Sequence, residues 1–503
     1  MCRKMDAKNR FSDLLEQLML RAGLKNNALA QRLQYDVSYI SKWISGRMLP
    51  AEKSIEKVLR EISECIVETI DPEGKRELYD EYLVESDQDL IGAVYDNLKA
   101  EYDYTKDIKR ASGVEVAPNT SFFLELPLLQ FIIKMKHPVL RRVKSQEIAA
   151  AIDILALEHE YRLMVVGIEG ENLSIHREYP GVHFSMLINM EVGERDYLYD
   201  PLFFMNMLIG FSNVDFYIYE SVQAHGKAIF AVKDAYVISG MLFDNNHCMS
   251  VVTSENAETC NTIYGKVKSM CSEDMLLFRS VTMHDMLVKY NYIQAVLSTN
   301  LRWLIGHMAE CFLPDDLFEE IVSKLDTMRI WKMDVAELRR IHNLLKNVLE
   351  ENKVQIMIYE STFTNFVVSG ELDFFNYKVT LTPMQRMRYM KYLLYVLNKN
   401  QNMEMKMVQR RFIANFQCTE QQSLYMSNAI SYLRLDNYHY RNNIAILNRP
   451  VIVEMFNRFY YEIWNNQKDV VIEEKSEILN DIDHFMKAVL LLSKTENTDD
   501  GIM

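Results

Sequence analysis

The side chains whose types and spacing point most directly to chemistry lie in residues 24–50. Two short helices are predicted to meet there at a tight turn, and the second presents Ser38, Ser41 and Lys42 on its outer face. Hydroxyl and ammonium groups are side-chain groups that hydrogen-bond to base edges. A short helix that carries them on its free side fits the major groove of DNA. This stretch therefore predicts contact with double-stranded DNA.

Four helices must position those side chains. Apolar residues at helical spacing predict them over residues 11–22, 27–33, 37–45 and 51–70. Asp36 can cap the third helix and Gly46 can end it, while Ile40 and Trp43 are expected in the core. The third helix is therefore expected to lie on the outside of a small helical domain.

Residues 11–66 resemble the Cro/C1-type helix-turn-helix domain of bacterial and phage repressors, the Xre family. The residues that carry the resemblance are Leu24, Leu29-Ala30, Leu33, Val37-Ser38, Ile40-Ser41, Trp43, Gly46-Arg47 and Pro50. The resemblance implies a sequence-specific transcriptional regulator of the bacterial cytoplasm. It also implies a homodimer, because such domains usually bind two half-sites about one helical turn of DNA apart.

By position, the resemblance assigns the DNA-binding residues. It gives base edges to Val37, Ser38, Ser41 and Lys42, and phosphates to Asn26, Tyr39 and Arg47. The sequence departs from the family at Gln34, where a turn glycine is common, and at Ile44-Ser45, where an acidic residue is frequent. A left-handed conformation at Gln34 costs about 1 kcal/mol. The alternative is that Lys42 and Arg47 are ordinary solvated charges on a module that docks another protein.

The charge distribution separates the first residues from the rest of the chain. The net charge is −14, but residues 1–66 hold 12 basic and 8 acidic residues, a balance of +4. A small basic domain on an acidic body suits local contact with DNA, because the body repels phosphate and discourages indiscriminate coating.

The remaining residues predict a mixture of helices and strands. Strands are expected over residues 163–168, 182–190, 214–219, 228–232, 236–239, 248–253, 354–359, 366–369, 404–408 and 444–447. Helices are expected over residues 145–159, 257–271, 284–350, 383–400, 419–434, 451–464 and 475–493.

We therefore predict a multidomain chain, with an all-α N-terminal domain followed by a helical connector and a large α/β (α+β) body. The predicted segments are a helix-turn-helix domain over 1–70, a helical connector over 71–160, body units over 161–350 and 351–493, and a frayed tail over 494–503. Residues 214–221 and 354–361 both end in Ile-Tyr-Glu-Ser, which suggests that the two body units are duplicates. The body is expected to sense an effector or to assemble.

One stretch of the body raises the question of an enzyme. His225-Gly226-Lys227, followed by an apolar strand and Gly240, looks like half of the phospholipase D-type motif. That resemblance implies a histidine that attacks phosphorus and a lysine that holds the phosphate. The acidic partner of the histidine would fall near Val232, which cannot supply it, and the second half offers only His439-Tyr440-Arg441. We therefore expect no catalytic residues, although a phosphodiesterase or nuclease carried to DNA remains the alternative.

Other sites have little support. The seven cysteines are widely spaced without a Cys-x-x-Cys pair, which indicates free thiols in a reducing cytoplasm. His176, Glu178 and His183 surround Pro180-Gly181, so they are expected as surface residues of a hairpin rather than as metal ligands.

We therefore expect neither a metal nor a cofactor. We also expect no contact with a membrane, because the longest apolar run, residues 202–211, covers about half the length of a membrane span. The expected partners are DNA, a second copy of the chain and an unknown small-molecule or peptide effector.

Overall fold

The fold is taken from a computed structural model. It describes residues 9–82, 84, 86–110, 120–137, 140, 145–170, 179–191, 195–211, 213–243, 246–289, 291–327, 335–415, 422–435 and 444–499. Contacts divide the chain into two compact units. Unit 1 comprises residues 1–139 and 226–264, and unit 2 comprises residues 140–225 and 265–503.

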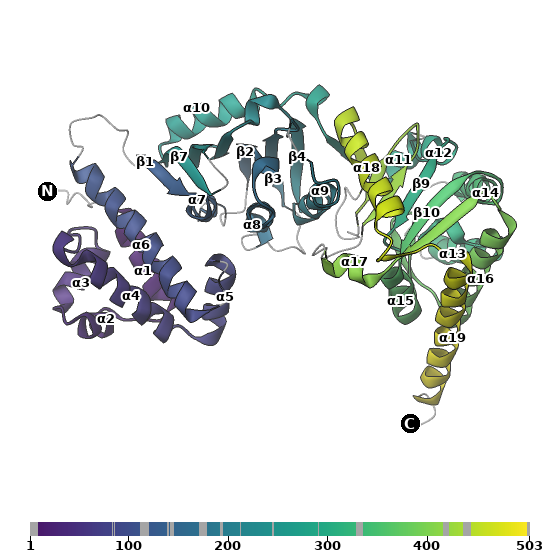
Figure 1. Cartoon of the computed structure of the whole chain (residues 1–503), viewed down its shortest axis with the longest axis horizontal. Coiled ribbons are helices and arrows are strands. Elements are labelled where there is room, and N and C mark those ends of the chain that lie inside the picture. Colours follow the sequence, from purple (N-terminus) through teal and green to yellow (C-terminus); the bar gives the residue numbers. More distant parts are fainter. Residues whose placement is uncertain are drawn as a thin grey trace. The chain divides into compact units, whose positions relative to one another are not determined.

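Unit 1 begins with a helical bundle, drawn in purple and blue (Figure 1). Its helices are α1 (Arg10–Arg21), α2 (Asn26–Leu33), α3 (Val37–Ile44), α4 (Ile55–Thr69), α5 (Pro72–Tyr82) and α6 (Asp87–Arg110), with the 3₁₀ turn η1 (Glu52–Ser54) before α4. The first four lie where the sequence predicts helices. Their apolar stripes meet in one core, in which Phe11, Leu29, Ile40 and Leu59 are fully buried.

Helix α6 completes that core and also contacts α7 (Leu128–Met135). Glu101 forms an ion pair with Lys134, and these side chains are only 9% and 8% exposed. The adjacent Tyr102 donates its hydroxyl hydrogen to the carbonyl of Pro50 (3.0 Å), and its ring packs edge-on against Phe11. Two neighbouring residues of α6 therefore hold the helix to two different parts of unit 1.

The strands of unit 1 are antiparallel. In spatial order they are β1 (Thr120–Pro127), β7 (His247–Ser254), β6 (Tyr236–Leu242) and β5 (Lys227–Val232). Helix α7 (Leu128–Met135) directly follows β1 and carries Lys134, while α10 (Ala257–Lys268) follows β7.

Unit 2 opens with parallel strands joined by helices. The elements are β2 (Gln146–Ile152), η3 (Ile154–Ala156), α8 (His159–Gly170), β3 (Tyr179–Ile188), α9 (Tyr199–Gly210), β4 (Val214–Glu220) and η4 (Val222–Ala224). Ala150 of β2 pairs with Met186 of β3, which pairs with Ile218 of β4. Parallel neighbours need such crossover helices, because a short turn cannot join them.

A mixed sheet organises the rest of unit 2. Its spatial order is β17 (Val471–Ile472), β13 (Met403–Val408), β10 (Val354–Tyr359), β9 (Leu301–Ile305), β14 (Ser423–Met426), β15 (Tyr432–Arg434), β16 (Ile444–Leu447) and β8 (Phe278–Val281). Strands β9, β10 and β13 are parallel, and the outer pairings are antiparallel. A separate hairpin joins β11 (Glu371–Phe374) to β12 (Tyr377–Thr380).

Helices cover both faces of this sheet. The remaining elements are η5 (Glu273–Met275), α11 (Met283–Val288), α12 (Asn291–Val296), η6 (Glu310–Phe312), α13 (Asp315–Thr327), α14 (Val335–Glu351), α15 (Glu360–Ser369), α16 (Pro383–Lys399), α17 (Arg410–Asn415), α18 (Pro450–Asn466) and α19 (Lys475–Asp499). Ile356 and Met405 belong to the apolar core that includes α13, α14 and α16. Lys406 points to the opposite face, where its ammonium group lies 4.7 Å from the ring centroid of Trp464 in α18.

Several predicted elements are wrong. The helix predicted over 145–159 is mostly strand β2, and the stretch 284–350, predicted to be helical, contains strand β9. The strands predicted over 163–168 and 366–369 lie in helices α8 and α15. The described part of 419–434, predicted to be a helix, forms strands β14 and β15. The run Ala149–Ala151 favours a helix in isolation, but it is fully buried in a parallel strand, and tertiary pairing overrides that propensity.

The predicted duplication fails beyond the strands that suggested it. Strand β4 is followed by η4 and then by β5, whereas β10 continues directly into helix α15. Ser239-Gly240 lies inside β6, but Gly370 caps α15 in a left-handed conformation with φ 68°. Ile-Tyr-Glu-Ser is therefore a local strand pattern and not the mark of a repeated unit.

At a coarser level the predicted fold class is confirmed: helices come first, and parallel and antiparallel strands combined with helices follow. The predicted boundaries after residues 70, 160 and 350 stay predictions. The segment 71–160 is not purely helical, because it contains β1 and β2, and α19 continues to Asp499 inside the tail predicted to fray. None of the described helices is both long enough and apolar enough to cross a membrane.

The helical core of unit 1 makes a test of the fold possible. Leu59→Ala removes a fully buried side chain, so we expect the free energy of unfolding of the bundle to fall by about 2–5 kcal/mol. Leu20→Ala is the matched control, because Leu20 is 74% exposed and its loss should change that free energy by less than about 0.5 kcal/mol. Hydrogen exchange of peptides from α1–α4 in urea measures both. Similar losses for the two variants would contradict this core.

Candidate functional site

Helix α3 is held in place by the start of α1. The side-chain amide of Asn9 donates to the carbonyl of Gly46 (3.1 Å), just beyond the end of α3. The fully buried Ser12 hydroxyl lies 2.6 Å from the carbonyl oxygen of Trp43. Because Ile40 and Trp43 are also buried, one side of α3 is fixed to the core.

The turn before α3 has the geometry that the sequence requires. Gln34 ends α2 in the left-handed conformation, with φ 56° and ψ 36°. Asp36 then caps α3, because its carboxylate accepts the N–H of Ser38 (2.8 Å). Hydrogen bonds from Ser38 lower the pKa of the Asp36 carboxyl, which keeps it charged. The expectation that a non-glycine residue adopts this conformation is confirmed.

The residues predicted to contact DNA lie on or beside the free side of α3. Val37 and Tyr39 are 40% and 42% exposed, respectively. Ser38, Ser41, Lys42 and Arg47 are exposed, and Asn26, the first residue of α2, is half-buried. The ammonium group of Lys42 lies 5.5 Å from the ring centroid of Tyr39. The structure therefore brings these side chains together on an accessible surface, although their role stays a prediction.

Arg32 is a nearby charge that the sequence did not single out. Its guanidinium pairs with Glu68 of α4 at 3.1 Å, with both side chains about half exposed. Arg32 therefore links α2 to α4, and its guanidinium is already paired with a carboxylate.

His225 has a buried acidic neighbour that the sequence did not reveal. Its Nδ1 lies 3.0 Å from Oδ2 of Asp153, a side chain only 2% exposed, and 3.3 Å from the side-chain nitrogen of Asn189. The imidazole itself is 77% exposed. A proton on Nδ1 directed at Asp153 leaves Nε2 as an accessible base or nucleophile.

The acidic partner therefore does not come from the motif that contains His225. Val232 is buried at the end of β5, and Asp234 accepts a hydrogen bond from Asn261 (2.5 Å). Lys227 is the first residue of β5 and is half-buried. His439-Tyr440-Arg441 lies outside the described residues, as do His176 and Glu178. His183 is half-exposed and pairs with Asp215 at 3.0 Å.

No group of three or more potential metal ligands occurs in the part of the chain that the structure describes. No protein-family model matches this chain, and no curated protein matches its sequence.

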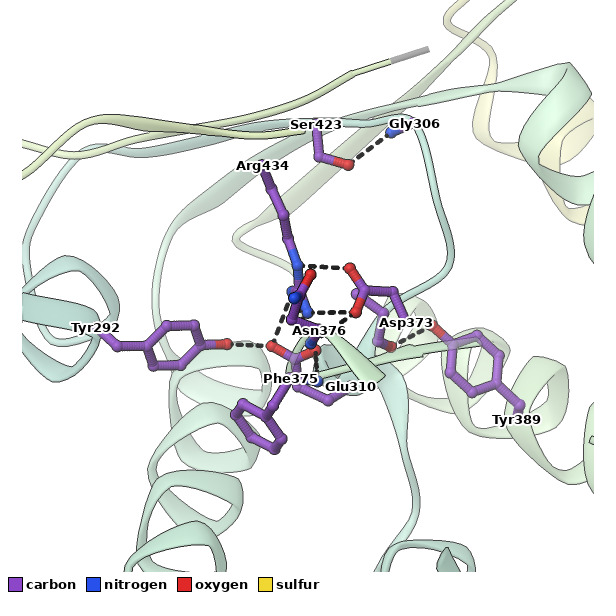
Figure 2. A network of polar contacts seen from close by, with 10 residues as sticks. Tyr292, Gly306, Glu310, Asp373, Phe375, Asn376, Tyr389, Ser423 and Arg434 are labelled. Carbon is purple, nitrogen blue, oxygen red and sulfur yellow. Dashed lines mark hydrogen bonds and ion pairs between the residues drawn. The ribbon is translucent and has the colours of Figure 1, made fainter. Parts of the chain in front are cut away.

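A network of buried polar side chains lies inside unit 2 and is shown in Figure 2. We call it the polar cluster. Arg434 of β15 reaches both Glu310 of η6 (3.1 Å) and Asp373 of β11 (2.5 Å), and the three side chains are at most 7% exposed. The Tyr292 hydroxyl donates to Glu310 (2.5 Å), and the N–H of Phe375 donates to the same carboxylate (3.2 Å).

This cluster joins elements that are distant in the sequence. With two carboxylates around one guanidinium, full ionisation would leave a buried negative charge. Burial raises the pKa of Asp373 to about 6, although Arg434 acts in the opposite direction. The void beside Tyr292 and Glu310 measures about 10 Å³, which is room for roughly one water molecule. The ion pairs of the cluster therefore act as a structural clamp between η6, β11 and β15.

The clamp predicts a large effect of removing its cation. Arg434→Met leaves two buried carboxylates without the cation between them, so we expect the free energy of unfolding to fall by about 3–5 kcal/mol. Arg340→Met is the control, because Arg340 pairs with Glu337 at the surface and its loss should cost less than about 1 kcal/mol. Urea unfolding followed by circular dichroism measures both variants. Equal losses would show that the buried pairs stabilise no more than a surface pair.

Proposed function

We propose that this chain is a sequence-specific DNA-binding transcriptional regulator of a bacterium or phage, acting in the cytoplasm as a homodimer. The observation that carries the proposal is the exposed side of α3, where Ser38, Ser41 and Lys42 stand on a helix fixed from behind by Asn9 and Ser12. A recognition helix needs this combination, because a mobile helix would lose entropy on docking.

The same surface divides into two roles. Val37, Ser38, Ser41 and Lys42 are assigned to base edges, which carry sequence information. Asn26, Tyr39 and Arg47 are assigned to phosphates, which set position and orientation. Since one domain neutralises only a few phosphates, binding should be weak and strongly salt-dependent unless two domains act together.

DNA binding by α3 can be tested with two lysines. We expect the full-length chain to select a preferred duplex from a random library, and Lys42→Ala to weaken binding to that duplex about tenfold. If Lys42 contacts a phosphate instead of a base, the same change should lower the slope of log affinity against log salt concentration by about 1. Fluorescence anisotropy at several salt concentrations measures both effects.

Lys57→Ala provides the control, because Lys57 is 80% exposed on α4 and its replacement removes the same charge from the same domain. Its affinity should stay within about twofold of the parent. Ser38→Ala should change which duplexes are selected. Unchanged affinity and selection in both α3 variants would remove α3 as the recognition helix, and no salt-sensitive binding at all would favour a protein-docking module.

The pairing of His225 with the buried Asp153 favours a second candidate, a phosphodiesterase or nuclease that the helical domain carries to DNA. A carboxylate that holds Nδ1–H orients an imidazole for attack by Nε2. The proposal does not depend on Lys227, which belongs to the other unit.

Hydrolysis of bis(p-nitrophenyl) phosphate tests this second candidate. If His225 is the nucleophile, His225→Ala should abolish turnover and Asp153→Asn should reduce it by about 10²–10⁴-fold. His183→Ala is the control, because His183 pairs with Asp215 elsewhere in unit 2 and should leave turnover unchanged. Turnover that survives in His225→Ala would exclude the assigned nucleophile.

A further inference from the structure

Among the described residues, pairing covers only part of one edge of strand β13. On one side its whole length, Met403 to Val408, pairs with β10. On the other side the described pairing with β17 covers only Met407 and Val408, opposite Ile472 and Val471. After Ile472 the chain turns away and begins α19 at Lys475.

The direction of the backbone groups follows from one hydrogen bond. The N–H of Gln409 donates to the carbonyl of Val470 (2.8 Å), so residue 409 directs its backbone groups toward the β17 side. Alternate residues of a strand direct these groups to the same side. Met407 and Met405 therefore direct their backbone groups to the same side as Gln409. The N–H and C=O of Met405 face the space beyond the end of β17.

That space is a cavity of about 470 Å³. This volume is within the range of pockets that hold small ligands. Its lining is divided into an apolar and a charged set. The apolar residues are Leu397, Met403, Met405, Ile478 and Leu479, and the others are Glu404, Lys406, Trp464, Glu473, Glu474 and Lys475.

The lining carries three carboxylates and two ammonium groups. Lys406 is bonded to the carbonyl of Trp464 (2.8 Å) and to Glu473 (2.9 Å), and Lys475 donates to the carbonyl of Leu397 (2.7 Å). Glu404 accepts a hydrogen bond from Gln355 (2.8 Å) and lies 3.8 Å from Lys353. Among the described residues, Glu474 is thus the lining carboxylate that is left without a side-chain partner, and a cationic group of a ligand complements it.

We propose that the cavity, which we name the β13 groove, binds an extended peptide in which apolar and basic residues alternate. The peptide would add to the edge of β13 in line with β17, exchanging backbone hydrogen bonds with Met405. Its side chains alternate between faces, as those of any strand do. Apolar side chains would pack against Leu397, Ile478 and Leu479, and a basic one would face Glu474. This binding does not depend on the proposed contact with DNA.

A labelled hexapeptide, Lys-Val-Lys-Val-Lys-Val, tests the β13 groove on the full-length chain. We expect saturable binding by fluorescence anisotropy and slower hydrogen exchange of the Met405 amide. A peptide N-methylated at its central residues should bind about fivefold to tenfold more weakly, because it lacks the donors that meet β13. Glu474→Lys should weaken binding of the parent peptide about threefold to tenfold.

Glu477→Lys is the matched control, because Glu477 lies in the first turn of α19 and does not line the groove. It should leave the affinity within about twofold of the parent. Three outcomes would overturn the proposal. The first is no saturable binding up to about 1 mM peptide, since a Kd of that size corresponds to a binding free energy of only about 4 kcal/mol. The others are equal binding of the N-methylated peptide and equal weakening by the two charge reversals. Equal weakening would mean general attraction to an acidic chain.

Discussion

The burial of Ile40 and Trp43 is the constraint on which the helical domain depends. An eight-residue helix such as α3 is too short to be stable alone in water, so its position comes from packing and from the contacts of Asn9 and Ser12. Fixing one side against the core leaves the other side in solvent. The surface that carries Ser38, Ser41 and Lys42 is therefore a direct result of how α3 is anchored.

Unit 2 solves a different problem, because its sheet is assembled from strands that are far apart in the chain. The Arg434 clamp ties β15 to β11 and η6 through charges that would be costly to bury alone. A buried ion cluster gives little net stability compared with apolar packing, but it strongly disfavours arrangements in which one charge loses its partners. The clamp thus favours one assembly of these elements.

The sequence predicted what local pattern determines and missed what tertiary contact determines. The bounds of α1–α3, the cap at Asp36 and the turn at Gln34 were predictable, because each depends on residues a few positions apart. Strand β2 was not, because Ala149–Ala151 favours a helix until parallel neighbours bury it. Asp153 beside His225, and Glu310 and Asp373 around Arg434, gave no signal, since no spacing rule joins such distant positions.

Helix α6 joins the helical bundle of unit 1 to α7. Glu101 holds α7 through a buried ion pair, and the next residue, Tyr102, holds Pro50 at the base of α4. Because these two residues are adjacent on α6, a single turn of one helix fixes both α7 and the loop that follows α3.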